Sequence, residues 1–281
     1  MTLVHFVTRL SVSLAVAAGV FLITHGAAVD AQQTAPAPTS PRGRAPADLT
    51  GYWVAVITED WRFRMVTPPR GDTASVPVNE AGQKAAAAWD PQKDIAASEQ
   101  CKAFGAAGLM RMPIRLRVSW QDDTTLKVES DNGQQIRLFH FGASEPSRGE
   151  PQWQGDSVAS WETVAEGQGI APAAGGGGGG RGGGPSPATR LTGSLKVVTT
   201  RMRPGYLRRN GVPYSGQALL TEFFDHSAEA NGDAWLIVTS TVEDPTYLTQ
   251  PFMTSTHFKK EPNGSKWSPR ACEVTLPVEG K

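Results

Sequence analysis

Apolar and polar residues alternate with a period of two through most of the chain, as expected for half-buried β-strands. In residues 115–120, for example, Leu116, Val118 and Trp120 alternate with polar neighbours. The predicted strands are Tyr52–Thr58, 115–120, Leu126–Glu129, Ile136–Phe141, Ser157–Val164, Ser194–Met202, Ala218–Asp225, Trp235–Glu243 and Phe252–Lys259. Trp61–Met65 alternates in the same way, and we expect it to continue the first strand.

Only one part of the chain has a helical pattern. Asn79 can cap a helix that begins at Glu80 and runs through alanine-rich sequence to Trp89, because alanine has the highest helix propensity. The pair Asp90-Pro91 interrupts this helix, since proline disfavours helical backbone in the preceding residue. We expect a second short helix over Lys93–Ala107.

After the helical region, most of the predicted strands follow one another with short turns between them. Asn132-Gly133 and Asn231-Gly232 are typical of tight hairpins. Such a run must close on itself or pack as two sheets, because open strand edges promote aggregation. We therefore predict a mainly β fold, an antiparallel up-and-down meander of about eight strands that closes into a lipocalin-like barrel with one or two short helices after the first strand. A barrel of about eight strands holds side chains or one small ligand.

The start of the chain has the pattern of a secretory signal peptide. His5 and Arg9 precede an apolar run, Leu10–Thr24, which is shorter than the ~20 residues that span a bilayer. Small residues at Val29 and Ala31 place the predicted cleavage after Ala31. We expect a signal peptide over residues 1–31 and a periplasmic or secreted protein without a stable membrane anchor; an uncleaved anchor is the alternative.

Two tracts have too little apolar bulk to offset the entropy of ordering. Residues 32–47 are rich in proline and alanine and predict a flexible leader. Residues 166–188 carry glycine runs around Arg181 and predict a disordered loop without a phosphate-binding motif. Because strand patterns lie on both sides of the glycines, we expect one β-barrel domain over 48–281 rather than two domains.

The chain has 281 residues and a formal net charge of zero. Without a basic excess, nucleic acid is not an expected partner. The two cysteines, Cys101 and Cys272, are expected to form a disulfide in an oxidising compartment, with two free thiols as the alternative. The bond would tie the C-terminal tail to the segment that holds Cys101.

Four stretches together resemble a family of uncharacterised exported bacterial proteins. They are Asp48–Trp53 (DLTGYW), Pro204–Ser215 (PGYLRRNGVPYS), Leu220–Phe224 (LTEFF) and Val242–Phe252 (VEDPTYLTQPF). The resemblance covers most of the predicted domain, but it implies no activity and no catalytic residue. Separately, Gly51-Tyr52-Trp53 before a β meander resembles the opening glycine and tryptophan of lipocalins.

Three titratable residues within strands are candidates for catalysis. His140, His257 and Glu222 could transfer protons if they met inside a barrel, because burial would raise the pKa of the carboxyl group. The alternatives are a satisfied structural pair, or a Glu222 that faces outward on a strand at a sheet edge. Histidines at ligand spacing are absent from the sequence, so we predict neither a metal site nor a cofactor.

Aromatic residues of the predicted strands suggest a binding function instead. Trp61, Trp120, Phe139, Trp161 and Phe224 are expected to line a site for a small, largely apolar molecule. Two alternatives stay open, namely an envelope protein-interaction module with a filled barrel, and an isomerase, cyclase or lyase that uses the three residues named above.

Arginines lie beside aromatic residues in two further segments. Trp61–Met65 contains Arg62 and Arg64, and Tyr206–Tyr214 contains Arg208 and Arg209. Arginine near rings can bind a carboxylate or phosphate group. The alternative is an arginine stem packed over a ring with its charge in solvent.

Overall fold

A computed structural model describes residues 39–142, 148–165 and 191–277 of the chain. These residues belong to one compact unit, Pro38–Lys281. The predicted signal peptide and the predicted glycine-rich loop lie outside the described residues, so both stay predictions.

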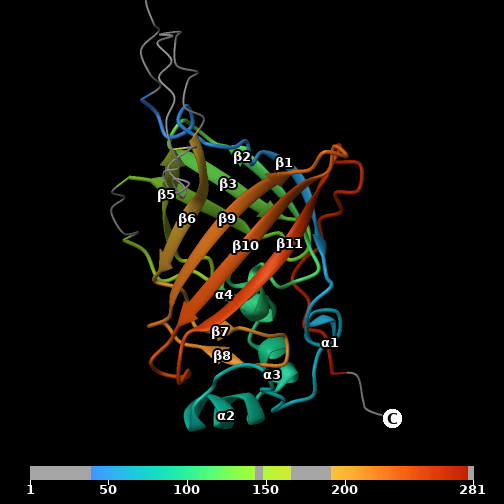
Figure 1. Ribbon diagram of the computed structural model, residues 1–281. Coiled ribbons are helices and arrows are strands. Elements are labelled where there is room, and N and C mark those ends of the chain that lie inside the picture. Colours follow the sequence, from blue (N-terminus) through green and yellow to red (C-terminus); the bar gives the residue numbers. More distant parts are fainter. Residues whose placement is uncertain (1–38, 143–147, 166–190, 278–281) are drawn as a thin grey trace, which may run out of the picture. The chain divides into compact units, whose positions relative to one another are not determined.

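Nine strands form a closed barrel, which confirms a mainly β barrel with a few short helices (Figure 1). Around the barrel the order is β1-β11-β10-β9-β6-β5-β4-β3-β2. The barrel strands are β1 (Gly51–Val56), β2 (Arg115–Trp120), β3 (Thr125–Ser130), β4 (Ile136–Phe141), β5 (Asp156–Ala165), β6 (Leu191–Thr200), β9 (Leu219–Ala228), β10 (Ala234–Glu243) and β11 (Phe252–Glu261). The small hairpin of β7 (Gly205–Tyr206) and β8 (Pro213–Tyr214) lies between β6 and β9 in the chain.

The barrel has nine strands, against the expected number of about eight, and it is not wholly antiparallel. β4 and β5 pair in parallel, with Phe139 opposite Ser157 and Phe141 opposite Ala159. Parity requires such a pair, because each antiparallel pairing reverses strand direction and a closed ring must contain an even number of reversals. A parallel pair also needs a long crossover rather than a tight turn, which is the segment between Phe141 and Asp156.

The helices are α1 (Trp61–Arg64), α2 (Glu80–Ala87), α3 (Pro91–Ala96), the 3-10 helix η1 (Gln100–Phe104) and α4 (Ala106–Leu109). As predicted, the Asn79 side chain caps α2 by accepting a hydrogen bond from the Gly82 backbone N–H at 2.9 Å. The second predicted helix is instead three short pieces, because Ser98 has a φ of 58° and Gly105 is extended. With the β7–β8 hairpin, α2, α3 and α4 gather at one end of the barrel, here called the capped end (Figure 1).

The segment Trp61–Met65 does not continue the first strand. Asp60 has a φ of 50°, and its carbonyl accepts hydrogen bonds from the Phe63 and Arg64 backbone N–H groups, which starts the helix α1. Phe63 and Arg64 are buried side by side, a pattern that alternation cannot produce. The period-two prediction was wrong here because five residues are too few to distinguish a strand from one turn of helix.

Burial alternates along the strands and shows which face points inward. The inward positions of β9, for example, are Leu220, Glu222 and Phe224. Two apolar clusters result, one in the middle of the barrel around Trp53 and one between the barrel and the capped end that includes Leu220 and Leu207.

Candidate functional site

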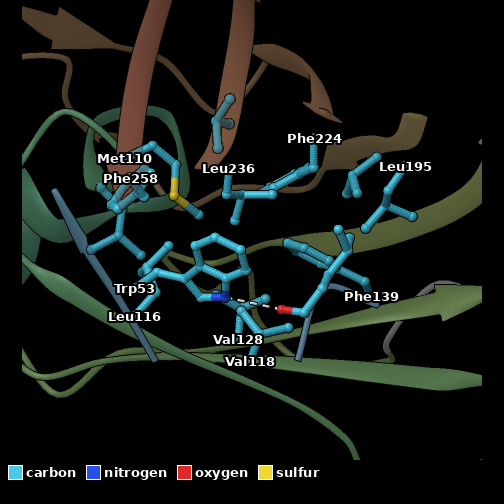
Figure 2. Packing of buried hydrophobic residues seen from close by; sticks show 14 of the residues in the cluster. Trp53, Met110, Leu116, Val118, Val128, Phe139, Leu195, Phe224, Leu236 and Phe258 are labelled. Atoms are coloured by element: carbon cyan, nitrogen blue, oxygen red, sulfur yellow. Dashed lines mark hydrogen bonds between the residues drawn. The ribbon is translucent and has the colours of Figure 1, made fainter. Parts of the chain in front are cut away.

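The middle of the barrel is filled by large apolar side chains. Trp53, Phe139 and Phe258 are 0% exposed and Phe224 is 3% exposed. Figure 2 shows these rings in one cluster, with the Trp53 indole N–H donating a hydrogen bond to the Leu49 carbonyl at 3.0 Å. A ligand in the centre would therefore have to displace this core.

Aromatic side chains become accessible at the barrel end opposite the capped end, here called the mouth. Trp120 lies at the end of β2, and its ring centroid is 5.5 Å from that of Phe141. The Phe141 centroid is 5.2 Å from that of Trp161 on β5. All three rings are partly buried against the apolar core of the barrel. The mouth therefore presents a group of three rings that the filled core supports from below.

A hollow of about 390 Å³ adjoins two of these rings, Phe141 and Trp161. Its lining comes from the segment before β1, the end of β4 and the middle of β5, namely Pro41, Arg44, Phe141, Gly142, Ala159, Ser160, Trp161 and Thr163. The parallel register places Ala159 opposite Phe141, and the small alanine side chain leaves room beside both rings. The hollow is within the size range of small-molecule sites.

The segment before β1, for which the composition predicted flexibility, forms hydrogen bonds with residues at the mouth. The indole N–H of Trp161 donates a hydrogen bond to the Pro41 carbonyl at 2.8 Å. The Arg42 backbone N–H donates to the Asp123 carbonyl at 3.2 Å. Contacts with the barrel thus begin well before Asp48, where composition placed the start of the folded part.

The five residues predicted to line a binding site have three different positions. Trp120 and Trp161 lie at the mouth, whereas Phe139 and Phe224 lie beneath it with ring centroids 5.4 Å apart. Trp61 lies outside the barrel on α1 and is 62% exposed. Phe141 was missed, although its period-two relation to Phe139 could have placed both rings on one face.

The structure does not bring His140, Glu222 and His257 together. Glu222 points into the barrel and is 0% exposed. His140 is on the outer face of β4, with Nδ1 3.4 Å from the Thr125 hydroxyl. His257 is on the outer face of β11, with Nδ1 3.7 Å from a Glu59 carboxylate oxygen. The proton-transfer hypothesis for these three residues therefore has no geometric basis.

Glu222 has a partner that the sequence did not reveal. Both terminal nitrogens of Arg137 donate to its carboxylate, at 3.1 and 2.6 Å, and the Arg137 side chain is also 0% exposed. Arg137 further donates to the Thr199 hydroxyl at 3.2 Å, which lies 2.8 Å from the Ser157 hydroxyl. This is a bidentate pair with its charges balanced, the structural alternative considered above.

A second polar group stabilises the capped end. The Asp94 carboxylate accepts hydrogen bonds from the Trp89 indole at 3.0 Å, from the Lys102 ammonium at 3.1 Å and from the Tyr206 hydroxyl at 2.9 Å. Burial, followed by the bond to Asp94, raises the pKa of Tyr206 well above its usual value. Tyr206 therefore stays protonated and acts as a hydrogen-bond donor to Asp94.

The two cysteines are bonded as predicted. Cys101 in η1 and Cys272 in the C-terminal tail form a disulfide with Cα atoms 5.1 Å apart. The bond holds the tail against the capped end, where the Thr67 and Thr275 hydroxyls also form a hydrogen bond.

The described residues contain no group of three potential ligands that could hold a metal ion. A membrane-spanning helix, long and apolar enough to cross a bilayer, is likewise not found among these residues. No family model, curated protein or solved structure matches the chain. The resemblance of the four sequence stretches to an exported family therefore stays a prediction.

Proposed function

We propose that this protein is exported and binds a small, largely apolar molecule at the mouth of its barrel. The observation that carries the proposal is the group of Trp120, Phe141 and Trp161 beside a hollow of about 390 Å³. Aromatic rings supply large apolar contact area with little loss of side-chain entropy. Arg44 at the edge of the hollow is exposed and could contact a polar end of the ligand.

Two features support export. The N-terminal pattern is that of a signal peptide. The disulfide between Cys101 and Cys272 is typical of proteins that fold in an oxidising compartment.

Binding can be tested with the purified protein and the uncharged apolar fluorescent dye Nile red, together with native mass spectrometry of the protein from its own cells. We expect Trp161→Ala to weaken dye binding by about tenfold, since 1.4 kcal/mol of lost contact corresponds to that factor. The matched control is Trp235→Ala, on the outer face of β10 beside Lys259, and it should bind as the wild type does. Equal losses in both variants would contradict a site at the mouth.

The filled centre of the barrel supports a second candidate, an envelope protein-interaction module. This candidate predicts that native mass spectrometry finds no small molecule and that the dye does not bind saturably. Crosslinking in intact cells should then recover a protein partner whose yield falls when loops at the mouth are changed.

A further inference from the structure

Five arginines gather around α1, at the end of β1 opposite the mouth. Arg62 and Arg64 belong to α1, Arg111 follows α4, and Arg208 and Arg209 lie in the loop between β7 and β8. The guanidinium carbon of Arg208 lies 4.0 Å from the centroid of the Phe63 ring, and that of Arg62 lies 4.5 Å from the same centroid. The fold thus unites the two arginine-aromatic segments of the sequence in one place, here called the arginine cluster.

The carboxylates of this region are already paired. Three ion pairs join them to arginines of the cluster, namely Glu59 with Arg64, Asp60 with Arg111 at 2.9 Å and Asp72 with Arg62 at 3.7 Å. Within the described part of the chain, Arg208 and Arg209 have no carboxylate within 4.0 Å. The arginine cluster therefore carries more positive charge than its own carboxylates balance.

Arg208 is the unusual member of the cluster. It is only 4% exposed, and none of its three guanidinium nitrogens has a hydrogen-bond partner among the described residues. Burial and then the neighbouring charge of Arg111 lower the pKa of Arg208 to about 10, so the group is still charged at neutral pH. A buried charge without a partner is costly, and chains normally avoid it.

We propose that the arginine cluster binds an oxyanion, the carboxylate or phosphate group of a small molecule, through the guanidinium of Arg208. A guanidinium presents parallel N–H donors that match two oxygens of such a group. Arg64 has one further unpartnered nitrogen, Nη2, and Arg209 has another, Nε. The three side chains together offer donors in excess of what the protein itself uses.

Two charged side chains of this region are exposed to solvent. Arg62 is 65% exposed and Asp60 is 42% exposed, and both are among the charged groups that act on Arg208. The nitrogens of Arg208 are covered in this structure, so an anion reaches them only when neighbouring side chains move. Asp60 cannot replace the anion without leaving its ion pair with Arg111.

Thermal unfolding of the purified full-length protein tests the site with inorganic phosphate and with acetate, each at constant ionic strength set by sodium chloride. We expect phosphate, acetate or both to raise the midpoint of unfolding in a saturable way, because an anion that binds only the folded state stabilises it. The anion with the larger effect identifies the preferred group. A midpoint that depends on ionic strength alone would overturn the proposal.

Two variants connect the effect to this site. Arg208→Met should weaken anion binding by about tenfold or more, as expected for loss of hydrogen bonds to a charged group. If that variant does not fold, the exposed Arg62→Met substitution should show a smaller loss in a folded protein. The matched control is Arg117→Met, whose arginine is paired with Glu129 on the outside of the barrel and which should respond as the wild type does.

The site does not depend on a ligand at the mouth, so the two proposals fail separately. Trp161→Ala should keep the full response to the anion, whereas Arg208→Met should keep dye binding. In the wild type, the side-chain Nε–Hε resonance of Arg208 should shift when the anion is added. A response that is unchanged in Arg208→Met, with no shift of this resonance, would assign the stabilisation to another part of the protein.

Discussion

Two buried arginines of this protein have opposite surroundings. Arg137, inside the barrel, donates two hydrogen bonds to the equally buried carboxylate of Glu222. Arg208, in the arginine cluster outside the barrel, is stacked on Phe63 and has no partner for any guanidinium nitrogen in the described residues. One charge is balanced within the chain, and the other is not.

The difference separates a structural role from a binding role. A balanced buried pair needs nothing from outside the chain, and here it joins β4 to β9 across the inside of the barrel. An unbalanced guanidinium keeps its charge over the whole physiological range, so it lowers stability until an anion arrives. Comparison of the two sites therefore predicts opposite responses to mutation.

The largest expected effect is at the balanced site. Glu222→Leu should lower the free energy of unfolding by about 3–5 kcal/mol, because it leaves the Arg137 charge buried without a partner. Denaturant unfolding measures this value. The double variant Arg137→Met with Glu222→Leu should recover most of the loss, since no charge remains to be buried.

A control on the barrel surface sharpens this result. Glu129 forms two hydrogen bonds to Arg117, which is 39% exposed. The Glu129 side chain is only 12% exposed, but Glu129→Leu should cost about 1 kcal/mol or less, because the Arg117 charge that is left behind stays in contact with water. If Glu222→Leu costs no more than Glu129→Leu, the Arg137–Glu222 pair is not shielded from water in the folded protein.

At Arg208, whose charge has no partner, mutation should raise the free energy of unfolding instead of lowering it. Arg208→Met should raise the free energy of unfolding by about 1–3 kcal/mol in buffer without phosphate or carboxylate, because it removes an unsatisfied buried group and keeps an apolar contact with Phe63. Denaturant unfolding of both proteins measures the change. A clear loss of stability would show that the Arg208 charge already has a compensating partner in the folded chain.

The smallest expected effect is a pH dependence of stability at His226, a residue that can lose its charge near neutral pH. Burial, and then the neighbouring charge of Lys260, lowers the pKa of His226 below its usual value. The unfolded chain therefore binds a proton on His226 more tightly than the folded protein does. The contribution of His226 to the free energy of unfolding is fully present above the unfolded pKa of about 6.5, and it is lost as the pH drops below that value.

We expect the wild type to lose slightly more stability than His226→Gln between pH 7.5 and pH 5.5. The difference between the two proteins, measured by denaturant unfolding at each pH, isolates this residue from the other titrating groups. Parallel pH profiles would mean that His226 is as well solvated in the folded protein as in the unfolded chain.

Much of the fold could be predicted, since local chemistry decides it. Alternation located the barrel strands, Asn79 located the start of α2, and the predicted export implied the disulfide between Cys101 and Cys272. The parallel pairing of β4 and β5 was not predicted, because it depends on closing an odd number of strands. Trp61–Met65 was too short for alternation to be decisive.

The structure separates the five aromatic residues that the sequence suggested for binding. Trp120 and Trp161 are at the mouth, Phe139 and Phe224 belong to the core, and Trp61 lies on α1. A sequence shows which residues share a strand face, but it does not show how deep in the barrel each of those residues lies. The alternation pattern is therefore the same for residues of the filled core and for residues of the mouth.

The sequence by itself determined where the strands and turns lie, which residues share a strand face, and which residue types are available for binding. Only the tertiary structure decided the pairing of charges, because Arg137 and Glu222 are 85 residues apart and nothing local links them. The same holds for Arg208, whose loop is far from α1 in the sequence and meets it only in the folded structure. The cost of a buried charge depends on its surroundings, and those are set by distant parts of the chain.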